Sequence, residues 1–434
     1  MRLPPAILAN AEEVLREILR FAAPADTTLS RYFKDHPRLG GRERGGIAEC
    51  IYNVLRNKSF YTDFSEAGGG ATMRRLTLLG MADAVGVESL GGLTEEEVAW
   101  VERILAIDRK VMHKSMRSNM PKWLFDKLVE QMGEEETLQL ADGMNSPAPL
   151  DLRVNTMKAT RDAVAEELAQ APIRSTPTPF SPTGLRVLQK PALQNLPLFK
   201  SGAIEVQDEG SQVLSAIVGA KRGEMVVDFC AGAGGKTLAL GAIMRNTGRL
   251  YAFDVSEKRL AKLKPRMARS GLSNVHPVQI AHERDAKIKR LAGKIDRVLV
   301  DAPCSGLGTL RRNPDVKWRQ KPDAIGELQV KQAAILAGAA RLLKGGGRLV
   351  YATCSFLDDE NDFIAKQFLD THPDFDLVPM SKVLAEQKIE LEMGDYLKLL
   401  PHKHQTDGFF AAVFERKPMA KKAVVKDEDE AVEE

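Results

Sequence analysis

Apolar residues in the first third of the chain recur with the period of an α-helix. In the segment that begins at Pro4, the residues Ile7, Val14, Leu15 and Ile18 fall near one face of a helix with 3.6 residues per turn. No alternation typical of a strand competes with this pattern. Further helical segments are expected at residues 42–56, 73–84 and 95–107, separated by glycine-rich breaks such as residues 68–70. The pattern predicts an all-helical N-terminal domain over residues 1–130.

The pattern changes between residues 131 and 200. Prolines recur from Pro147 to Pro197, and each is typical of a turn or a break. A helical segment over residues 160–171 lies between two short apolar runs, residues 150–155 and 185–188, which have the length of strands. We expect a small α+β module or an elaborated linker here.

From Ile204 onward, short apolar runs alternate with segments of helix length. The runs MVVDF, LYAFDV, DRVLVDAP and GRLVYATC are typical of buried strands. Their alternation with helices predicts an α/β domain over residues 201–417, with a mostly parallel sheet covered by helices on both faces. The predicted strands end at Asp228, Asp254, Asp301 and Cys354. Because ligands bind beyond the carboxyl ends of strands in open α/β sheets, these four side chains should face one crevice.

The composition restricts the class of protein more than it indicates a function. With 434 residues the chain is longer than one hydrophobic core usually supports, and 44% hydrophobic with 28% charged residues is typical of a globular protein. No apolar run reaches the roughly 18 to 20 residues of a membrane-spanning helix, and the start MRLPPAILAN is too short for a signal peptide. We therefore expect a cytoplasmic protein with no membrane partner.

Neither the total charge nor the cysteine content points to a ligand. A net charge of +3 from 62 basic and 59 acidic residues means that a nucleic-acid partner must be argued from where the charges lie. The four cysteines, Cys50, Cys230, Cys304 and Cys354, include no CxxC pair, which argues against a disulfide framework and a zinc site. We expect no metal. Residues 418–434 lack apolar periodicity and end in an acidic cluster, so they are predicted to form a disordered charged tail.

The motif DFCAGAGGKT, residues 228–237, occupies a predicted strand-to-helix turn. Its glycines let the backbone approach a ligand closely, and N–H groups at a helix start suit a polar or anionic group. The ending GKT also resembles a nucleotide-binding P-loop. That alternative is disfavoured, because Cys230 stands where the P-loop needs its first glycine and Asp228 would face the phosphates with the wrong charge.

Two acidic residues follow the next predicted strands. Asp254 comes 22 positions after Gly232, close to the spacing at which an acidic residue accepts hydrogen bonds from a ribose. This spacing indicates a cofactor that contains a nucleoside. Alternatively, Asp254 only caps the helix that begins near Ser256. Asp285 stands where a third strand should end, and it is a candidate contact of an adenine or of the adenine's loop, or else a solvated charge.

Two further motifs each carry a cysteine. DAPCSGLGT, residues 301–309, precedes a basic and aromatic stretch, which is either an exposed loop or a polynucleotide contact with cations for phosphates and a ring for a base. YATCS, residues 351–355, precedes a predicted helix start, where thiols can react as thiolates, although a cysteine at a buried strand end is often only a small hydrophobe. The basic stretch contains Arg311, Arg312, Lys317, Trp318 and Arg319.

Taken together, these motifs resemble the RNA cytosine-5 methyltransferase family, in its bacterial ribosomal-RNA branch with a helical N-terminal domain. The resemblance covers about residues 200–417 through GAIEVQDEGSQ, DFCAGAGGKT, FDVSEKRL, DAPCSGLGTLRRNPDVKWR, YATCSFLDDEND and DGFFAAVFER. The stretch ADTTLSRYFKDHPRLGGRERGGIAECIYNVLRN is similar to the antiterminator-like RNA-binding domain of these enzymes, and DLRVN resembles the start of their middle module. The chain has Gly232 and Ala233 where the family commonly has Ala and Pro, which predicts a more flexible loop.

The resemblance implies a Rossmann-like methyltransferase domain with S-adenosylmethionine as methyl donor. It implies a substrate cytosine in RNA, methylated at carbon 5, and we expect 16S ribosomal RNA in a single-stranded or loop region. We expect a monomer with no obligate protein partner. The residues that the resemblance places on S-adenosylmethionine are Cys230, Ala231, Gly232, Ala233, Gly234, Gly235, Lys236, Asp254, Asp285 and Asp301.

The resemblance also assigns catalytic roles to four side chains. Carbon 5 of cytosine is a poor nucleophile, so a thiolate must first add to carbon 6, and the family gives this attack to Cys354. The family gives the later release step to Cys304. Asp301 is suited to hydrogen-bond the base, and Lys236 to assist electrostatically. Candidate contacts of an unstacked base are the aromatic residues Trp318 and Phe409.

Three other functions remain open at this point. An RNA-binding ribosome-assembly factor would keep the fold without catalysis, although the intact pair Cys304 and Cys354 argues against it. A redox protein would close a disulfide between these cysteines, which a cytosolic location disfavours. A DNA methyltransferase is not excluded by the basic stretches, and only the family resemblance and the N-terminal domain favour RNA.

Overall fold

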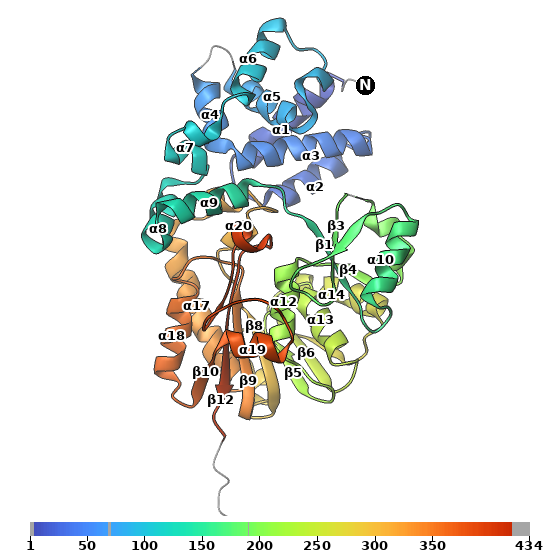
Figure 1. Ribbon diagram of the computed structural model, residues 1–434, viewed down its shortest axis with the longest axis vertical. Helices are drawn as coiled ribbons and strands as arrows, with labels where there is room; N and C mark the ends of the chain where they lie inside the picture. The colour runs from blue at the N-terminus through green and yellow to red at the C-terminus, as the bar shows by residue number, and fades with distance from the viewer. Residues whose placement is uncertain (1–3, 68–70, 190, 419–434) are drawn as a thin grey trace, which may run out of the picture.

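The computed structural model describes residues 4–67, 71–189 and 191–418, and it contains a helical region, a small antiparallel sheet and a larger α/β region (Figure 1). The helical region lies at one end of the molecule, and the small sheet lies beside the α/β region. The predicted glycine-rich break at residues 68–70 and the predicted tail from residue 419 onward lie outside the described residues. Within these ranges no helix is long and apolar enough to cross a membrane.

The N-terminal region is helical, as predicted. The apolar face of its first helix, which includes Ile7, Val14, Leu15 and Ile18, is buried against residues of the third and fifth helices. The sixth helix begins with a capping box in which Thr94 accepts a hydrogen bond from the backbone N–H three residues on. The helices are α1 (Ala6–Ile18), α2 (Ala25–Asp35), α3 (Gly41–Arg56), α4 (Lys58–Glu66), α5 (Thr72–Val85), α6 (Glu95–Leu105), α7 (Lys114–Ser118), α8 (Lys122–Met132) and α9 (Glu134–Asn145), with short 3₁₀ turns η1 (Val87–Ser89) and η2 (Arg109–Val111).

Helical structure continues past residue 130, where we expected it to end. Leu140 and Met144 of α9 are buried in one cluster with Leu124 and Leu128 of α8, and this cluster also includes Leu307 of the α/β region. Two helices therefore lie between the first core and the α/β region, and one of them, α9, falls in the stretch that the sequence pattern assigned to the middle module.

The middle region is a four-stranded antiparallel sheet of order β2-β3-β1-β4. The predicted strands at residues 150–155 and 185–188 correspond to β1 (Leu150–Val154) and β3 (Gly184–Val187). Residues 204–206 differ from expectation, because β4 pairs with β1 and Ile204 is buried in the core of this small sheet. The other elements are α10 (Arg161–Gln170), β2 (Ser175–Pro177), η3 (Leu193–Asn195), α11 (Pro197–Lys200) and β4 (Ile204–Val206).

The α/β region has the predicted mostly parallel sheet with helices on both faces. Along the order β10-β12-β9-β8-β5-β6-β7, the strands from β9 to β7 are parallel, and β12 is antiparallel to β9, β10 and β11. The strands are β5 (Met225–Asp228), β6 (Arg249–Asp254), β7 (Val275–Gln279), β8 (Ile295–Asp301), β9 (Leu343–Thr353), β10 (Phe375–Val378), β11 (Leu397–Leu399) and β12 (Phe409–Arg416). The helices are α12 (Glu209–Ile217), α13 (Gly235–Ile243), α14 (Glu257–Ser270), α15 (Ala286–Lys289), η4 (Leu307–Thr309), α16 (Val316–Arg319), α17 (Pro322–Ala340), α18 (Asp362–Thr371), α19 (Met380–Glu386) and α20 (Pro401–His404).

The strand order places a topological switch point in the middle of the sheet. From β5 the chain runs outward through β6 and β7, then returns to β8 on the other side of β5. The connections on the two sides diverge at this point, so a crevice forms beyond the carboxyl ends of β5 and β8. The apolar residues Val226, Val227, Val298 and Leu299 bury both faces of these strands, which is typical of parallel sheets.

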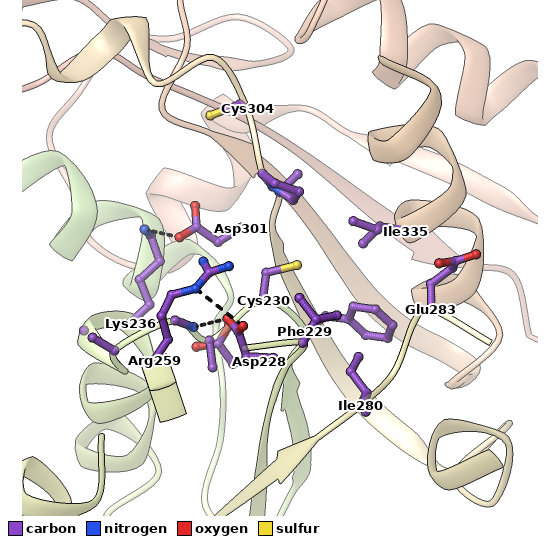
Figure 2. Close-up of a pocket in the computed structure, with 18 of the residues that line it drawn as sticks. Asp228, Phe229, Cys230, Lys236, Arg259, Ile280, Glu283, Asp301, Cys304 and Ile335 are labelled. Carbon is purple, nitrogen blue, oxygen red and sulfur yellow. Dashed lines mark hydrogen bonds and ion pairs between the residues drawn. The ribbon is translucent and has the colours of Figure 1, made fainter. Parts of the chain in front are cut away.

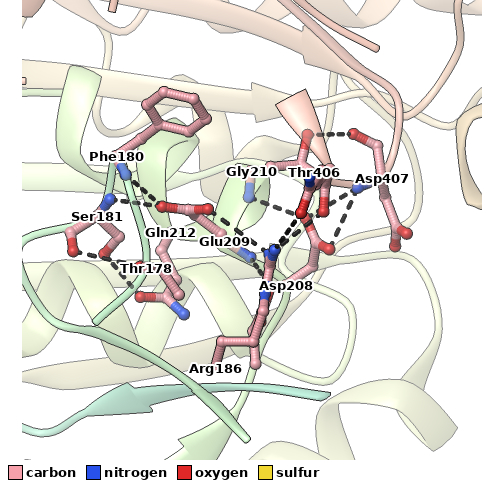
Figure 3. Close-up of polar contacts among 12 residues, drawn as sticks. Thr178, Phe180, Ser181, Arg186, Asp208, Glu209, Gly210, Gln212, Thr406 and Asp407 are labelled. Carbon is pink, nitrogen blue, oxygen red and sulfur yellow. Dashed lines mark hydrogen bonds and ion pairs between the residues drawn. The ribbon is translucent and has the colours of Figure 1, made fainter. Parts of the chain in front are cut away.

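Buried polar contacts join the small sheet to the α/β region (Figure 3). Arg186 of β3, which is ion-paired with Asp151 of β1 inside the small sheet, also lies 3.7 Å from Oε2 of Glu209 and donates to the carbonyl of Gln405 at 3.2 Å. Glu209, in the first turn of α12, is fully buried and accepts a hydrogen bond from the backbone N–H of Ser181 at 2.9 Å. Because a buried carboxylate is costly without such donors, these contacts restrict the position of the small sheet beside the crevice.

Candidate active site

A pocket of about 610 Å³ lies at the carboxyl ends of β5, β6 and β8 (Figure 2). The four predicted strand-end residues, Asp228, Asp254, Asp301 and Cys354, all line it. Because β5, β6, β8 and β9 are parallel neighbours, their ends meet at the same edge of the sheet. The predicted meeting of these residues in one crevice is therefore confirmed.

The glycine loop between β5 and α13 forms one wall of the pocket. Gly232 has a φ of +57°, and its backbone N–H donates to Oδ2 of Asp254 at 2.8 Å. Gly234 has a φ of +86°, and an added Cβ would lie 2.1 Å from Leu263 of α14, so this glycine packs against a helix and does not line the pocket. The predicted residues of this loop that do line the pocket are Cys230, Ala231, Gly232, Ala233, Gly235 and Lys236.

Asp254 fixes the glycine loop from the end of β6. Its Oδ1 accepts a hydrogen bond from the backbone N–H of Ser256 at 2.7 Å while Oδ2 holds the loop, and the side chain is 3% exposed. The alternative that Asp254 caps the following helix is wrong, because the hydroxyl of Ser256 is the N-cap of α14 and accepts from Arg259 N–H. The guanidinium of Arg259, which also lines the pocket, lies 3.6 Å from Asp254.

Asp285 does not line the pocket, contrary to the prediction. β7 ends at Gln279, and Asp285 caps α15 by accepting hydrogen bonds from Lys287 N–H and Ala281 N–H, both at 2.8 Å. These backbone hydrogen bonds lower the pKa of Asp285. The pocket is lined instead by the residues that directly follow the strand, among them Ile280 and Glu283.

Lys236 and Asp301 form an ion pair inside the pocket. Nζ of Lys236 lies 2.7 Å from Oδ2 of Asp301. Burial lowers the pKa of Lys236, but the charge and hydrogen bond of Asp301 outweigh that effect and raise it overall, so the amine stays cationic. Nearby, burial raises the pKa of Asp228 to about 7, although a hydrogen bond from Thr237 opposes this shift.

Cys304 and Cys354 lie side by side at the mouth of the same pocket. Their sulfur atoms are 3.3 Å apart, and both are free thiols. The hydrogen bond to Cys354 and burial raise the pKa of Cys304 well above its usual value. The expected helix N-terminus at Cys354 is wrong, because α18 begins only at Asp362 and a turn intervenes.

A buried carboxylate connects the two cysteine-bearing turns. Glu360 is fully buried and accepts hydrogen bonds from Ser305 N–H at 2.8 Å, Ser305 Oγ at 2.6 Å and Gln332 Nε2 at 3.0 Å. Ser305 Oγ also lies 3.2 Å from Oγ of Ser355, the residue after Cys354. Sequence analysis missed this role, because Glu360 belongs to an acidic run that is typical of a helix start.

Most of the basic stretch after the first cysteine motif is held by contacts within the protein. Lys317 is 2% exposed, and its Nζ donates to the carbonyl of Arg56 at 3.1 Å and to Oδ1 of Asn145 at 2.9 Å. Burial lowers the pKa of Lys317 to about 7. Trp318 Nε1 donates to the carbonyl of Leu55 at 2.8 Å. Trp318, a predicted contact of an unstacked base, is partly buried and packs against the core of the helical region, with Nζ of Lys58 4.8 Å from its ring centroid.

The remaining arginines of this stretch have partners within the protein. Arg311 is buried and donates to the carbonyl of Thr406 at 3.2 Å, while Arg312 is ion-paired with Asp208 and Asp407 at 2.9 and 2.7 Å. Figure 3 shows Asp208 and Asp407 facing each other. Arg319 pairs with Asp315, whose carboxylate also accepts a hydrogen bond from Ala25 of α2. The stretch therefore joins the helical region to the α/β region.

Several pocket residues could not be identified from motifs. Phe409, a predicted base contact, does not line this pocket: it is 6% exposed, and its ring centroid lies 5.6 Å from Nζ of Lys236. Proximity to a strand end was the available signal for Ile280, whereas Ile335 comes from the middle of α17 and carries no local signal. The pocket residues that sequence analysis did not single out include Gln207, Phe229, Arg259, Ile280, Glu283, Lys331 and Ile335.

The chain matches a known family in both sequence and profile. Residues 215–415 match the profile described as 16S rRNA methyltransferase RsmB/F, and residues 120–194 match the ferredoxin-like domain of RsmF/B-like methyltransferases. The chain is 31% identical to "Probable ribosomal RNA small subunit methyltransferase B" of Synechocystis over 92% of this chain and 97% of that protein. It is 32% identical to the ribosomal RNA small subunit methyltransferase B of Yersinia pseudotuberculosis over 85% of this chain and 80% of that protein.

Solved structures share the fold. The crystal structure of the protein PH0851 is 26% identical and superposes with a TM-score of 0.75, covering 96% of this chain and all (100%) of that one. A methyltransferase homologue from Pyrococcus horikoshii is 29% identical, with a TM-score of 0.61 over 71% of this chain and 100% of that one. From the length and identity of these matches, the chain belongs to the RsmB/F family of S-adenosylmethionine-dependent ribosomal RNA methyltransferases.

Proposed function

We propose that this protein transfers a methyl group from S-adenosylmethionine to carbon 5 of a cytosine in 16S ribosomal RNA, through a covalent bond between Cys354 and the base. The observation that carries the proposal is the pair of sulfur atoms 3.3 Å apart, in the same pocket as the glycine loop and the Lys236–Asp301 ion pair. Relatives named ribosomal RNA small subunit methyltransferase B support the choice of RNA.

The residues of the pocket fit S-adenosylmethionine, which supplies an electrophilic methyl group when bound. A Cβ added at Gly232 would meet nothing within 4 Å, so the loop leaves open space along its wall. Phe229, Ile280 and Ile335 provide apolar surface for a flat base, and the carboxylate of Asp254 stands at a strand end, where ribose hydroxyls are commonly bound. These residues would hold the adenosyl part.

Cys354 is the proposed nucleophile. After its proton has passed to water, the thiolate forms an S–C bond at carbon 6 of the cytosine, and the electron pair of the ring double bond moves to carbon 5. Carbon 5 would then take the methyl group as the bond from that methyl to the sulfonium sulfur breaks, which leaves S-adenosylhomocysteine. Negative charge develops on the ring during the addition. In this proposal Asp301 hydrogen-bonds the base at nitrogen 3 or its amino group, and the cationic Lys236, whose Nζ lies 2.7 Å from Oδ2 of Asp301, offsets the developing charge.

Cys304 is the proposed base for the release step. After methyl transfer, carbon 5 still carries its proton, which must leave before the carbon–sulfur bond to Cys354 can break and the ring double bond can reform. At rest, Cys304 holds its own proton, because the neighbouring Cys354 and burial raise its pKa. Once Cys354 has become a thioether, that interaction is lost, so the pKa of Cys304 falls. Cys304 can then release its proton to water, and the resulting thiolate accepts the carbon 5 proton.

We also propose that residues 1–130 form an RNA-binding domain and that the protein acts as a monomer. The basis for the first statement is the likeness of the helical N-terminal sequence to an RNA-binding domain. Because a stacked base cannot expose its face to Cys354, the target cytosine should lie in single-stranded or loop RNA, or be flipped out of its helix.

The proposal is tested with tritiated S-adenosylmethionine and deproteinised 16S ribosomal RNA from cells that lack the gene. Wild type should place label on carbon 5 of cytosine, Cys354→Ala should lose labelling, and Cys304→Ala should accumulate a protein–RNA adduct that survives denaturation. Cys50→Ala is the matched control, because Cys50 is fully buried in the core of the helical region and should leave both readouts unchanged.

Two outcomes would contradict the proposal in different ways. If wild type labels neither free RNA nor partly assembled subunits, an RNA-binding assembly factor without catalysis becomes the better interpretation. If Cys354→Ala stays active, methylation stands but Cys354 is not the nucleophile.

A further inference from the structure

A second cavity of about 780 Å³ lies in the helical region, outside the site described above. It is enclosed by the C-terminal part of α3, the segment from η2 to α7 and the end of α9. Four cationic side chains line it: Arg56, Arg109, Lys110 and Arg117. We call this cavity the helical pocket.

The carboxylates of the helical pocket neutralise only one of these cations by direct contact. Asp142 is ion-paired with Arg117, at 2.6 Å. Asp83 accepts a hydrogen bond from the hydroxyl of Tyr61 at 2.9 Å, and Asp108 accepts one from the backbone N–H of Lys110 at 2.9 Å. The ammonium of Lys110 and the guanidiniums of Arg56 and Arg109 therefore have no carboxylate in contact within the described ranges of the chain.

Arg56 shows most clearly that a countercharge is missing. It is 8% exposed, its Nη2 donates to the carbonyl of Arg311 at 3.2 Å, and its Nε has no hydrogen-bond partner among the described residues. Behind it, the buried Nζ of Lys317 donates to the carbonyl of Arg56, and the charge of Arg56 adds to burial in lowering the pKa of Lys317. Buried cations are normally paired, so Arg56, with Arg109 and Lys110 beside it in the wall and no carboxylate of the described chain in contact with any of the three, indicates room for an external anion.

The chemistry of the remaining wall favours a nucleotide over a simple anion. The amide oxygens of Asn53, Asn57 and Asn119 already accept from Arg56, Arg109 and the Phe60 N–H, so N–H groups of Asn53 and Asn119 are what the amides can still offer to a base or a ribose. Arg109 lies over the ring of Phe60, with its guanidinium 4.8 Å from the ring centroid. Guanidinium forks match phosphate oxygens, and a cavity of this volume is within the usual range for small ligands.

The helical pocket is also connected to the catalytic turn. The carbonyl of Arg311 accepts from Arg56, and Nη2 of Arg311 donates to the carbonyl of Pro147, another residue of the pocket wall. Arg311 follows Cys304 by seven positions in the same chain segment. From the cations of the pocket wall and this connection, we propose that the helical pocket binds a phosphate and its nucleotide in a single-stranded segment that flanks the target cytosine. This inference rests on the proposed function.

The test measures the salt dependence of binding between full-length protein and deproteinised 16S ribosomal RNA. Each phosphate contact on a single strand contributes about −0.7 to the slope of log K against log salt concentration. Arg109→Ala with Lys110→Ala should reduce the magnitude of the slope by roughly 1 to 1.4. The Michaelis constant for RNA should rise about tenfold, and the rate at saturating RNA should stay near wild type, because neither residue lies in the catalytic pocket.

Two further variants separate this effect from misfolding and from a general loss of charge. Asp142→Asn frees Arg117 and should strengthen RNA binding with a steeper slope, a gain that misfolding does not produce. Lys366→Ala with Lys382→Ala removes the same charge from exposed positions of α18 and α19 and should leave the slope unchanged. An unchanged slope in the Arg109 and Lys110 variant, with methylation intact, would overturn the helical pocket but not the proposed function. Failure of wild type to methylate any RNA would overturn the proposed function instead.

Discussion

The catalytic pocket and the basic stretch from Arg311 to Arg319 follow each other in the chain but use their charges differently. In the catalytic pocket, Lys236 and Asp301 pair with each other while their side chains still line open space. In the basic stretch, Lys317 and Arg311 are buried against backbone carbonyls of other segments. Charged residues at a strand end thus line the pocket. A run of cations that begins only ten residues later instead holds the helical region against the α/β region.

This difference shows what a local pattern of charge can indicate. A strand end in a parallel sheet has a defined place, because neighbouring strands end at the same edge. A basic run has no such place, and its surroundings depend on which part of the chain packs against it. We therefore expect substitutions in the pocket to reduce the rate, and substitutions in the basic stretch to change stability without changing RNA contacts.

The largest effect is expected for Asp301→Asn. Loss of the carboxylate removes a partner for the base and releases Lys236, so the rate at saturating RNA should fall by about 10²- to 10³-fold. Asp296→Asn is the matched control, since Asp296 is the second residue of the same strand, at its opposite end, and pairs with Lys344. Single-turnover labelling should show a normal rate for Asp296→Asn. Equal losses for both variants would mean that strand stability, and not the pocket, explains the effect.

Lys317→Met should change the pH dependence of stability. The pKa of Lys317 is lowered from 10.5 to about 7, so between these pH values the unfolded chain binds more protons than the folded one. Stability should then rise with pH across this window, by up to about 1.4 kcal/mol per pH unit, and the full penalty should remain below about pH 7. Met keeps much of the side-chain volume but cannot titrate, so the stability of Lys317→Met should change less with pH than that of wild type.

Urea unfolding at pH 6 to 10 measures this effect. Lys344→Met, which removes a half-exposed lysine from an ion pair on β9, should keep the slope of wild type. If the plots of unfolding free energy against pH run parallel for Lys317→Met and wild type, the amine of Lys317 titrates normally. The buried contact with Arg56 is then weaker than the structure indicates.

The part of the site that was predictable from sequence is the part that follows from strand periodicity. Asp228, Asp254 and Asp301 end apolar runs and meet as expected. Asp285 was misplaced because β7 ends six residues before it, and loop residues beyond a strand end have no fixed direction. Glu360 carries no sequence signal at all, since its burial depends on Ser305 and Gln332, which are distant in the chain.

Glu360→Gln should have a smaller effect than loss of Asp301. The amide keeps the shape but removes the charge, so the hold on the Cys304 turn weakens and the rate should fall roughly tenfold, equivalent to about 1.4 kcal/mol. Glu360 is also one of the groups that raise the pKa of Cys304, after Cys354 and burial. The limb of the pH–rate profile that reports Cys304 should therefore move to lower pH.

A positioning role and a merely structural one differ in this pH profile. Asp359→Asn provides the control, because the neighbouring Asp359 is partly exposed and pairs with Lys127. It should leave the profile in place. A slower Glu360→Gln enzyme with an unshifted profile would mean that the carboxylate only supports the fold of the turn.

The smallest effect is expected for Arg319→Ala. This variant tests most directly whether the charges of the basic stretch are used within the protein or on RNA. Arg319 is about one-third exposed (32%) and pairs with Asp315, whose carboxylate also accepts from Ala25 N–H, so its charge is used within the protein. Its loss should change the salt-dependence slope of RNA binding by less than about 0.3, whereas loss of Lys110 alone should change it by about 0.7. Both variants remove one positive charge, so each should reduce the long-range electrostatic attraction of RNA by the same amount. If Arg319→Ala changes the slope as much as Lys110→Ala, the basic stretch contacts RNA as the sequence pattern suggested. The pairing with Asp315 then does not keep Arg319 from binding RNA.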